Sequence, residues 1–273
     1  MSRRFKAATE KELAAQQSRT LGELSLVAIM IDGIHIADHV VVTALGIAED
    51  GQKHILGFRD GSTENSEVCS ALLRDLVSRG LSVNRSLLFV IDGGLGIREA
   101  IRSVFGQRAL IQRCRIHKQR NVEGHLPKKL RTRVVQAMRE AYALKSAKTA
   151  KKRLKALARS LQDSHPSAAN SLMEGLDETL TIQSLKLSKR LQRFFSTTNA
   201  IENLNGQVRR VTKRVKRWRG GSMILRWIAA SYTEAEKGFR RIQGYKGLTI
   251  LAAALRSHDE KLNQEIDPLL QAA

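Results

Sequence analysis

The chain has 273 residues, of which 42% are hydrophobic and 27% charged, and this balance excludes a wholly disordered protein. Lys and Arg outnumber Asp and Glu by 47 to 26, so the formal net charge of +21 favours a polyanionic partner without specifying any chemistry. The sequence has no apolar run of the ~18 residues that span a bilayer, no secretory signal and only two cysteines. We therefore expect a cytoplasmic protein without a membrane segment or a disulfide framework.

The first half of the chain predicts a small sheet. Residues 1–24 are polar and are expected to form a helical arm. Three Val- and Ile-rich runs, the last two separated by the turn Glu49-Asp50-Gly51, predict a meander of strands over Leu26–Ile31, His39–Ile47 and Lys53–Arg59. Gly61-Ser62-Thr63 offers helix caps, and apolar residues at helical spacing predict a helix that Gly80 ends. A fourth strand over Ser86–Ile91, a helix over Leu95–Phe105 and a fifth strand over Ala109–Cys114 follow.

The second half is expected to be helical. An Ala-, Leu-, Lys- and Arg-rich stretch predicts an all-helical insertion over residues 122–195. A further helix begins near Thr198, and the last helix covers Ser222–Ile242. We divide the chain into an arm (1–24), a catalytic domain (25–121 and 196–256), the insertion (122–195) and a C-terminal tail (257–273).

Three acids carry the functional prediction. Asp32 closes the first strand, Asp92 closes the fourth, and Glu202 lies on a helix after the fifth. The element order is that of an α/β protein with an RNase H-like mixed five-stranded sheet flanked by helices. In such a sheet the first and fourth strands are neighbours, so Asp32 and Asp92 meet at the strand ends.

Carboxylates that meet in this way are costly unless a cation neutralises them. Hard oxygen ligands suit Mg²⁺ or Mn²⁺ rather than zinc. Two such ions about 4 Å apart can activate an attacking oxygen and stabilise a leaving oxygen in phosphoryl transfer. Each acid alone has another interpretation, as a turn or helix cap or a first-turn acid. Three other acids, Asp60, Glu64 and Glu99, fit the sheet order less well.

The helix that carries Glu202 is amphipathic. Its apolar stripe is predicted to contain Ile201, Leu204, Val208, Val211 and Val215, whereas Glu202 heads a row of Asn205, Arg209, Lys213 and Lys216. The basic run is expected to contact the DNA backbone, although a solvated helix face is the alternative: Arg209, Arg210, Lys213, Arg214, Lys216, Arg217 and Arg219. Trp218, within this run, could stack on a base or pack against the last helix.

At these residues the chain resembles the mutator-type bacterial insertion-sequence transposases, a family with a DDE acid triad. The matching stretches are GFRDGSTEN (57–65), LLRDLVSRGL (72–81), LLFVIDGGLGIREAI (87–101), QRCRIHKQRNV (112–122), TTNAIENLNGQVRRV (197–211) and KRWRGG (216–221). The resemblance implies an RNase H-like catalytic domain with an all-α insertion before the last catalytic helix. It assigns the metal-binding acids to Asp32, Asp92 and Glu202.

The resemblance also implies a role for Cys114-x-x-His117. Such a pair could be half of a zinc site, but no convincing second pair follows, since Cys69 and His125 are distant candidates. We expect a structural role, with Cys114 packed in the fifth strand and His117 near the acids.

Family members usually carry a helix-turn-helix region before the catalytic domain, whereas 25 residues precede the first predicted strand here. The resemblance implies metal-dependent hydrolysis and strand transfer on double-stranded element ends and target DNA, by a homodimer or larger assembly. An RNase H-like nuclease that cuts without joining, and a truncated DNA-binding remnant without catalysis, are the alternatives.

Overall fold

The computed structural model describes residues 3–61 and 66–271, with the side chains at 3, 5 and 266–271 left out of the description. Strands occupy the first half of the chain, and the elements follow in this order: α1 (Arg3–Ser18), β1 (Leu26–Ile36), β2 (His39–Ala48), β3 (Lys53–Gly61), α2 (Ser66–Ser78), β4 (Leu87–Ile91), α3 (Leu95–Phe105), η1 (Gly106–Arg108), β5 (Ala109–Arg113), α4 (Arg115–Gly124), α5 (Lys128–Ala143), α6 (Ala147–Leu161), α7 (Pro166–Met173), η2 (Asp177–Thr179), α8 (Thr181–Ser184), α9 (Lys189–Phe195), α10 (Asn199–Thr212), α11 (Gly221–Lys237), η3 (Tyr245–Gly247) and α12 (Leu248–Gln271).

The strands form one mixed sheet in the order β3-β2-β1-β4-β5. β2 lies antiparallel to both β1 and β3, whereas β4 runs parallel to β1 and β5 runs parallel to β4. The first and fourth strands are therefore neighbours, as the sequence predicted. The predicted fold class, an α/β protein with a mixed five-stranded sheet of RNase H-like order, is confirmed.

β1 is longer than predicted, because it continues past Ile31 to Ile36. Its parallel pairing with β4 ends at Ile31↔Ile91, but its antiparallel pairing with β2 goes on to Ile36↔His39. Asp32 therefore lies inside a strand, at the point where β4 ends and the sheet continues as β1, β2 and β3. Hydrogen bonds to β2 satisfy the backbone beyond that point, which is why the strand does not stop at the acid.

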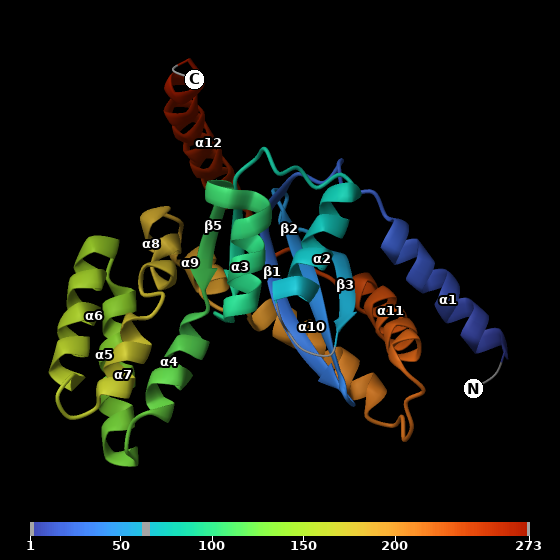
Figure 1. Ribbon diagram of the computed structural model, residues 1–273, viewed down its shortest axis with the longest axis horizontal. Helices are drawn as coiled ribbons and strands as arrows, with labels where there is room; N and C mark the ends of the chain where they lie inside the picture. Colours follow the sequence, from blue (N-terminus) through green and yellow to red (C-terminus); the bar gives the residue numbers. More distant parts are fainter. Residues whose placement is uncertain (1–2, 62–65, 272–273) are drawn as a thin grey trace.

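Helices cover both faces of the sheet (Figure 1). On one face, α2 and α3 bury Leu72, Leu73 and Ile101 against alternate residues of the strands. On the other face, α9, α10, α11 and α12 bury residues such as Phe195, Leu204, Ile228 and Tyr232. Strand residues alternate between the two cores, and the carboxyl ends of the parallel strands are left facing the space between α4 and the β1–β2 hairpin.

The helices between β5 and α10 have a hydrophobic core of their own, with Met138, Leu154 and Leu172 at its centre. Two buried cations on α4 join this helix to the helices that follow it. The Arg115 guanidinium donates to Thr179 O at 2.9 Å and to Gln183 Oε1 at 2.8 Å, and Lys118 Nζ donates to Ser171 O at 2.6 Å. Because both side chains are buried, these contacts fix the helical part against α4 rather than leaving the two cations for an external partner.

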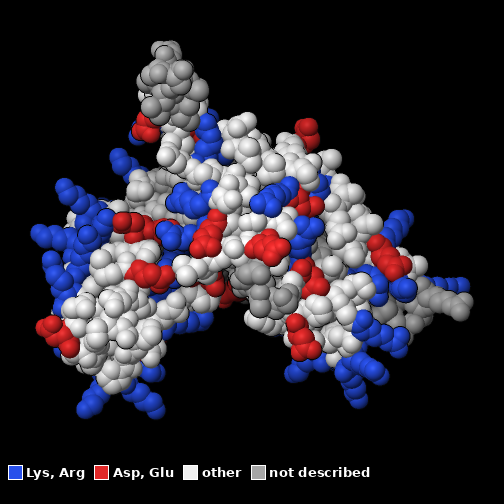
Figure 2. Space-filling view, viewed as in Figure 1, with Lys and Arg blue, Asp and Glu red and all other residues white. Residues whose placement is uncertain are grey.

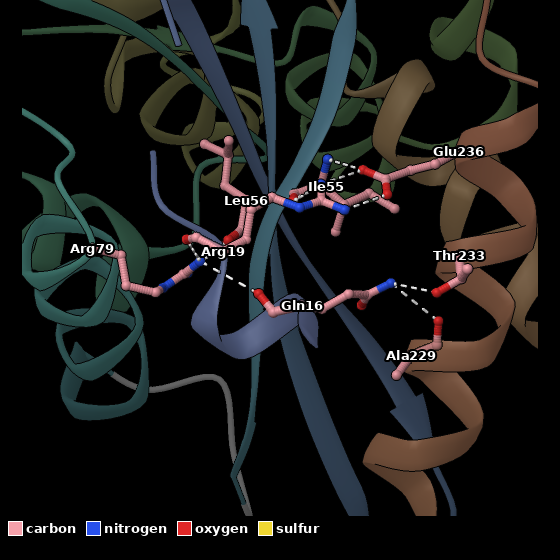
Figure 3. A network of polar contacts seen from close by, with 8 residues as sticks. All are labelled: Gln16, Arg19, Ile55, Leu56, Arg79, Ala229, Thr233 and Glu236. Atoms are coloured by element: carbon pink, nitrogen blue, oxygen red, sulfur yellow. Dashed lines mark hydrogen bonds and ion pairs between the residues drawn. The ribbon is translucent and has the colours of Figure 1, made fainter. Parts of the chain in front are cut away.

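The N-terminal helix α1 packs along α11, and Figure 3 shows the polar contacts at its end. Gln16 Nε2 donates to Thr233 Oγ1 at 2.9 Å, and Arg19 pairs with Glu236 at 2.8 Å. Glu236 Oε1 also accepts from the Ile55 backbone at 3.0 Å, so one carboxylate joins α1, α11 and β3. The predicted N-terminal helix is thus part of the folded structure.

Several predicted limits differ from the structure. The predicted helix from Ser222 ends at Lys237 and is not the last, because α12 follows. The helix from Thr198 ends at Thr212, so Val215 lies outside it, and Val211 is 46% exposed rather than part of the apolar stripe. The predicted caps Ser62 and Thr63 lie outside the described residues. α4 crosses the predicted boundary at 121/122 and α12 crosses the one at 256/257; the domain division stays a prediction.

Candidate active site

Asp32 and Asp92 lie side by side on neighbouring parallel strands. They directly follow Ile31 and Ile91, which are register partners of β1 and β4. The pKa of Asp32 is raised to about 6, first by burial and next by the Asp92 carboxylate, with a further contribution from Glu202. Asp32 and Glu202 line one hollow, and Asp92 follows the register partner of Ile31, so the structure places the three predicted residues in one region.

Glu202 is on the first turn of α10, and local contacts fix this turn. Thr198 Oγ1 donates to Glu202 Oε1 at 2.5 Å. The Arg115 backbone nitrogen donates to Ser196 O at 2.8 Å, and the Cys114 nitrogen donates to Ile91 O at 2.7 Å. The start of α4 is therefore bonded both to the strand that precedes Asp92 and to the segment that precedes Glu202.

Asp32 and Glu202 face a hollow of about 420 Å³. Its wall is polar and comes from β1, α4 and α10: Asp32, Gly33, His117, Arg120, Glu202, Asn203, Asn205 and Arg209. The outline of the molecule in Figure 2 is indented between the helical part and the remainder, on the side where the parallel strands end in Figure 1. The hollow is open enough to admit an extended ligand to the acids.

A chain of hydrogen bonds holds Asp32 from within the protein. Asn205 Nδ2 donates to Asp32 Oδ2 at 2.8 Å, and the Tyr232 hydroxyl donates to Asn205 Oδ1 at 3.4 Å. Tyr232 in turn shares a 2.7 Å hydrogen bond with Thr43, the register partner of Asp32 on β2. Asn205 is buried, so it orients the acid and is not part of an exposed row. The predicted row on α10 contained Asn205 but did not reveal its burial against Asp32; its position one turn after Glu202 is the signal that could have indicated this role.

The loop after Asp92 requires glycine. Gly93 has a φ of +109°, and a Cβ there would lie 1.8 Å from Arg113 Nε. Gly94 donates its backbone N–H to Asp92 Oδ1 at 2.8 Å, which closes a tight turn around the carboxylate. Arg113 is buried and pairs with Glu174 at 3.0 Å. The loop after the second acid is thus packed against an arginine that also contacts the helical part, a role that spacing alone did not reveal.

The Cys114-x-x-His117 motif lies against Glu202. β5 ends at Arg113, so Cys114 caps α4 instead of lying in the strand. Ligand atoms of Cys114, His117 and Glu202 all lie within 4.8 Å of one another. His117 Nδ1 is 3.8 Å from Glu202 Oε1, and the pKa of His117 is raised, mainly by its hydrogen bond with Cys114. The third member of this group is thus Glu202, and no second Cys/His pair joins it among the described residues.

The cysteine itself is embedded in this arrangement. Cys114 is fully buried, which raises its pKa, but hydrogen bonds from His117 and Thr198 outweigh this and lower the pKa overall. The other cysteine, Cys69, is buried on α2 in the separate core with α3. Cys114 and His117 therefore lie next to the Glu202 side chain and restrict the orientation of its carboxylate.

The predicted basic run borders the hollow but is not one helical row. Arg209 and Arg210 end α10, Lys213 and Arg214 form a turn, and the remaining cations lie in the coil before α11. Beyond the end of the helix, Trp218 packs against α11, where it makes an edge contact with Trp227 at 6.4 Å. All seven cations are exposed, and no ion pair within the described part of the chain neutralises them.

The competing acids have other environments. Asp60 accepts from His39 Nδ1 at 2.8 Å and lies against Gly221, at the start of α11. Glu99 is exposed on α3, and Glu64 lies outside the described residues. Neither described acid lines the hollow that contains Asp32 and Glu202.

The strand order and the acid-lined hollow define an α/β protein with a polar site at the carboxyl ends of its parallel strands. A family model described as "Transposase, Mutator family" matches residues 2–241. The chain belongs to the Mutator family of transposases. It is 31% identical over 219 residues to the transposase for insertion sequence element IS6120 of Mycolicibacterium smegmatis, and this match covers 78% of this chain and 66% of the relative.

Two further relatives carry similar names. The transposase for insertion sequence element IST2 of Acidithiobacillus ferrooxidans is 29% identical, over 72% of this chain and 65% of its own length. The transposase for insertion sequence element ISRM3 of Rhizobium meliloti (strain 1021) is 28% identical, over 76% of this chain and 50% of its own length. The chain thus spans between half and two thirds of these relatives.

None of its described helices is long and apolar enough to cross a membrane.

Proposed function

We propose that this chain is the catalytic core of a DDE-type DNA transposase that hydrolyses phosphodiester bonds at the ends of an insertion sequence and joins the freed strands to target DNA. The observation that carries the proposal is geometric: Asp32 and Asp92 follow register partners on neighbouring parallel strands, and Asp32 shares the wall of one hollow with Glu202. Burial and the two neighbouring carboxylates raise the pKa of Asp32, as is typical of acids at a site that binds cations.

The donor set fits Mg²⁺ or Mn²⁺, which take carboxylate oxygens, and two ions are proposed with Asp32, Asp92 and Glu202 as ligands. Bound there, the ions would supply Lewis-acid activation of the attacking oxygen and charge stabilisation of the leaving oxygen. The fit is also electrostatic: burial and, next, the neighbouring carboxylates raise the pKa of Asp32, and a divalent cation would favour its charged form.

The chain's own side chains then have separate tasks. Asn205 keeps one Asp32 oxygen engaged and leaves the other free to face the hollow. The turn at Gly93 and Gly94 holds Asp92 at the strand end. Arg209, on the wall of the hollow, and the exposed cations after it are placed to hold a phosphate backbone of double-stranded DNA. A homodimer or larger assembly is proposed, because pairing two DNA ends requires two copies of the site.

The test is a strand-transfer assay with a pre-cleaved element end, a supercoiled target and Mg²⁺ or Mn²⁺. The proposal expects joined products that disappear when Glu202→Gln is used. Cleavage of DNA without joining would favour an RNase H-like nuclease instead. Metal-independent binding with neither activity, also with the flanking region of a full-length relative supplied in trans, would favour a non-catalytic DNA-binding protein.

A further inference from the structure

A second hollow, of about 640 Å³, lies on the flank of α10 that faces away from Asp32. α9, α10 and the segment from the end of α11 to Gln243 enclose it. Cations from three parts of the chain surround it: Lys53, Arg190, Arg193, Arg240 and Arg241. Glu234 is the one acid among its described lining residues, so the groove carries an excess of positive charge. We call it the α9–α11 groove.

The floor of the α9–α11 groove is aromatic and apolar. Phe194 and Phe239 line it together with Leu204. Both rings are only partly buried against the core, so part of each remains available to a ligand. Lys53 Nζ lies 4.9 Å from the centre of the Phe239 ring, which places a cation next to an aromatic surface. This combination suits a ligand with both a flat ring and an anionic group.

The side of the groove formed by α10 is lined with amides. Asn199, Asn203 and Gln207 are exposed there, and each can donate and accept hydrogen bonds, as the edges of nucleobases do. Asn203 also lines the hollow that contains Asp32 and Glu202. The two hollows therefore meet at one residue, and a strand leaving the candidate active site could cross α10 there.

We propose that the α9–α11 groove binds a single-stranded segment of DNA next to the candidate active site. The cations would hold its phosphates, Phe194 and Phe239 would stack on unpaired bases, and the amides would contact base edges. A duplex is disfavoured because its base faces are stacked on one another and unavailable to an aromatic side chain. The volume matches pockets of roughly 300–1,000 Å³ that enclose small organic groups. This inference rests on the proposed function, which supplies the DNA strand.

The test measures fluorescence anisotropy of a labelled twelve-residue oligo-dT and of a blunt duplex, with the whole chain and no metal. Arg190→Ala/Arg193→Ala should weaken single-strand binding about tenfold at ~0.1 M salt. The slope of log affinity against log salt should become shallower by about 1.4, since each phosphate contact to a single strand contributes ~0.7 to it. The matched control, Arg74→Ala/Lys261→Ala, removes two exposed cations elsewhere and should change neither affinity more than twofold. Duplex binding by the groove variant should also stay within twofold.

A second variant tests the aromatic floor. Phe239→Leu retains an apolar side chain, so the fold should survive, but it removes a stacking surface. An oligonucleotide with 2-aminopurine should lose fluorescence when it stacks in the unaltered protein and lose much less in this variant. Equal loss of single-strand and duplex binding in Arg190→Ala/Arg193→Ala, or unchanged quenching in Phe239→Leu, would overturn the proposal.

These outcomes are separable from those of the proposed function. A protein that joins strands but shows no groove-dependent single-strand binding would retain the proposed function and lose this inference. A protein that does not cleave DNA but whose single-strand affinity still depends on Arg190 and Arg193 would retain this inference and lose the proposed function.

Discussion

Asn205 and Asp32 are joined by a 2.8 Å hydrogen bond across the contact between α10 and β1. The bond connects two of the three elements that carry the acids, because Glu202 lies on the same helix as Asn205. It also lowers the pKa of Asp32 against the larger raising effect of burial. The position of Glu202 relative to Asp32 thus depends on a buried amide that carries no charge.

Asn205→Ala should weaken metal binding and destabilise the fold. Removal of the amide leaves Asp32 Oδ2 and the Tyr232 hydroxyl without this partner, at a cost of about 1–3 kcal/mol in the free energy of unfolding. Isothermal titration with Mn²⁺ and urea unfolding would measure both effects. Asn203→Ala, an exposed neighbour, is the control and should change stability by less than about 0.5 kcal/mol. Equal effects of the two substitutions would show that the bond to Asp32 contributes nothing.

Asp32→Asn should stabilise the metal-free protein at neutral pH. The pKa of Asp32 is about 6 in the folded protein and 3.8 in the reference state, so the folded state binds the proton more tightly. Its contribution to stability is therefore full below pH 4 and is lost as pH rises through about 6. In EDTA at pH 7.5 the free energy of unfolding of the variant should exceed that of the parent by at most about 3 kcal/mol, an upper bound because the group is partly accessible.

The same comparison at pH 4 should give a much smaller difference, because Asp32 is then almost fully protonated in the folded protein. Added Mn²⁺ should raise the unfolding midpoint of the parent and leave that of Asp32→Asn nearly unchanged. A stability gain that is the same at pH 4 and pH 7.5 would mean that the carboxylate is not destabilised by its neighbours.

Gly93→Ala should distort the loop that holds Asp92. The positive φ and the close approach of Arg113 predict a loss of about 2–4 kcal/mol in the free energy of unfolding. Gly124→Ala is the control, because nothing lies within 4 Å of a Cβ there. Arg113→Ala in the same chain should relieve part of the loss, with a coupling energy of about 0.5–3 kcal/mol in a double-mutant cycle. Strictly additive losses would exclude packing of Arg113 on Gly93.

The basic run should govern salt-dependent binding of duplex DNA. Arg209→Ala/Lys213→Ala/Lys216→Ala should flatten the slope of log affinity against log salt by about 2–3, because each lost phosphate contact releases fewer counterions. Anisotropy titrations at several salt concentrations measure this slope. Arg74→Ala/Arg256→Ala/Lys261→Ala removes the same charge from another surface and should alter the slope little. Affinity that is constant from low to high salt would contradict a backbone contact.

The sequence predicted the strands and their order well, because apolar runs with flanking glycines are local signals and an element order restricts the sheet. It predicted the neighbourhood of Asp32 and Asp92 for the same reason. It could not predict that α10 stops at Thr212, since tertiary packing of Trp218 overrides a basic helical pattern. The sequence also could not predict contacts between distant residues. The packing of Arg113 on Gly93 and the burial of Lys118 arise only when β5, α4 and the helical part pack together.

The central claim is that Asp32, Asp92 and Glu202 share divalent cations, and metal binding tests it without requiring DNA or catalysis. Binding of Mn²⁺ to the chain can be followed by the loss of the free-ion EPR signal. We expect saturable binding by the parent and by Asp163→Asn, an exposed acid on the helical part, and strongly weakened binding by Asp92→Asn, because a neutral amide is a far weaker ligand for the ion. Equal binding of Mn²⁺ by the parent and by Asp92→Asn would contradict the account.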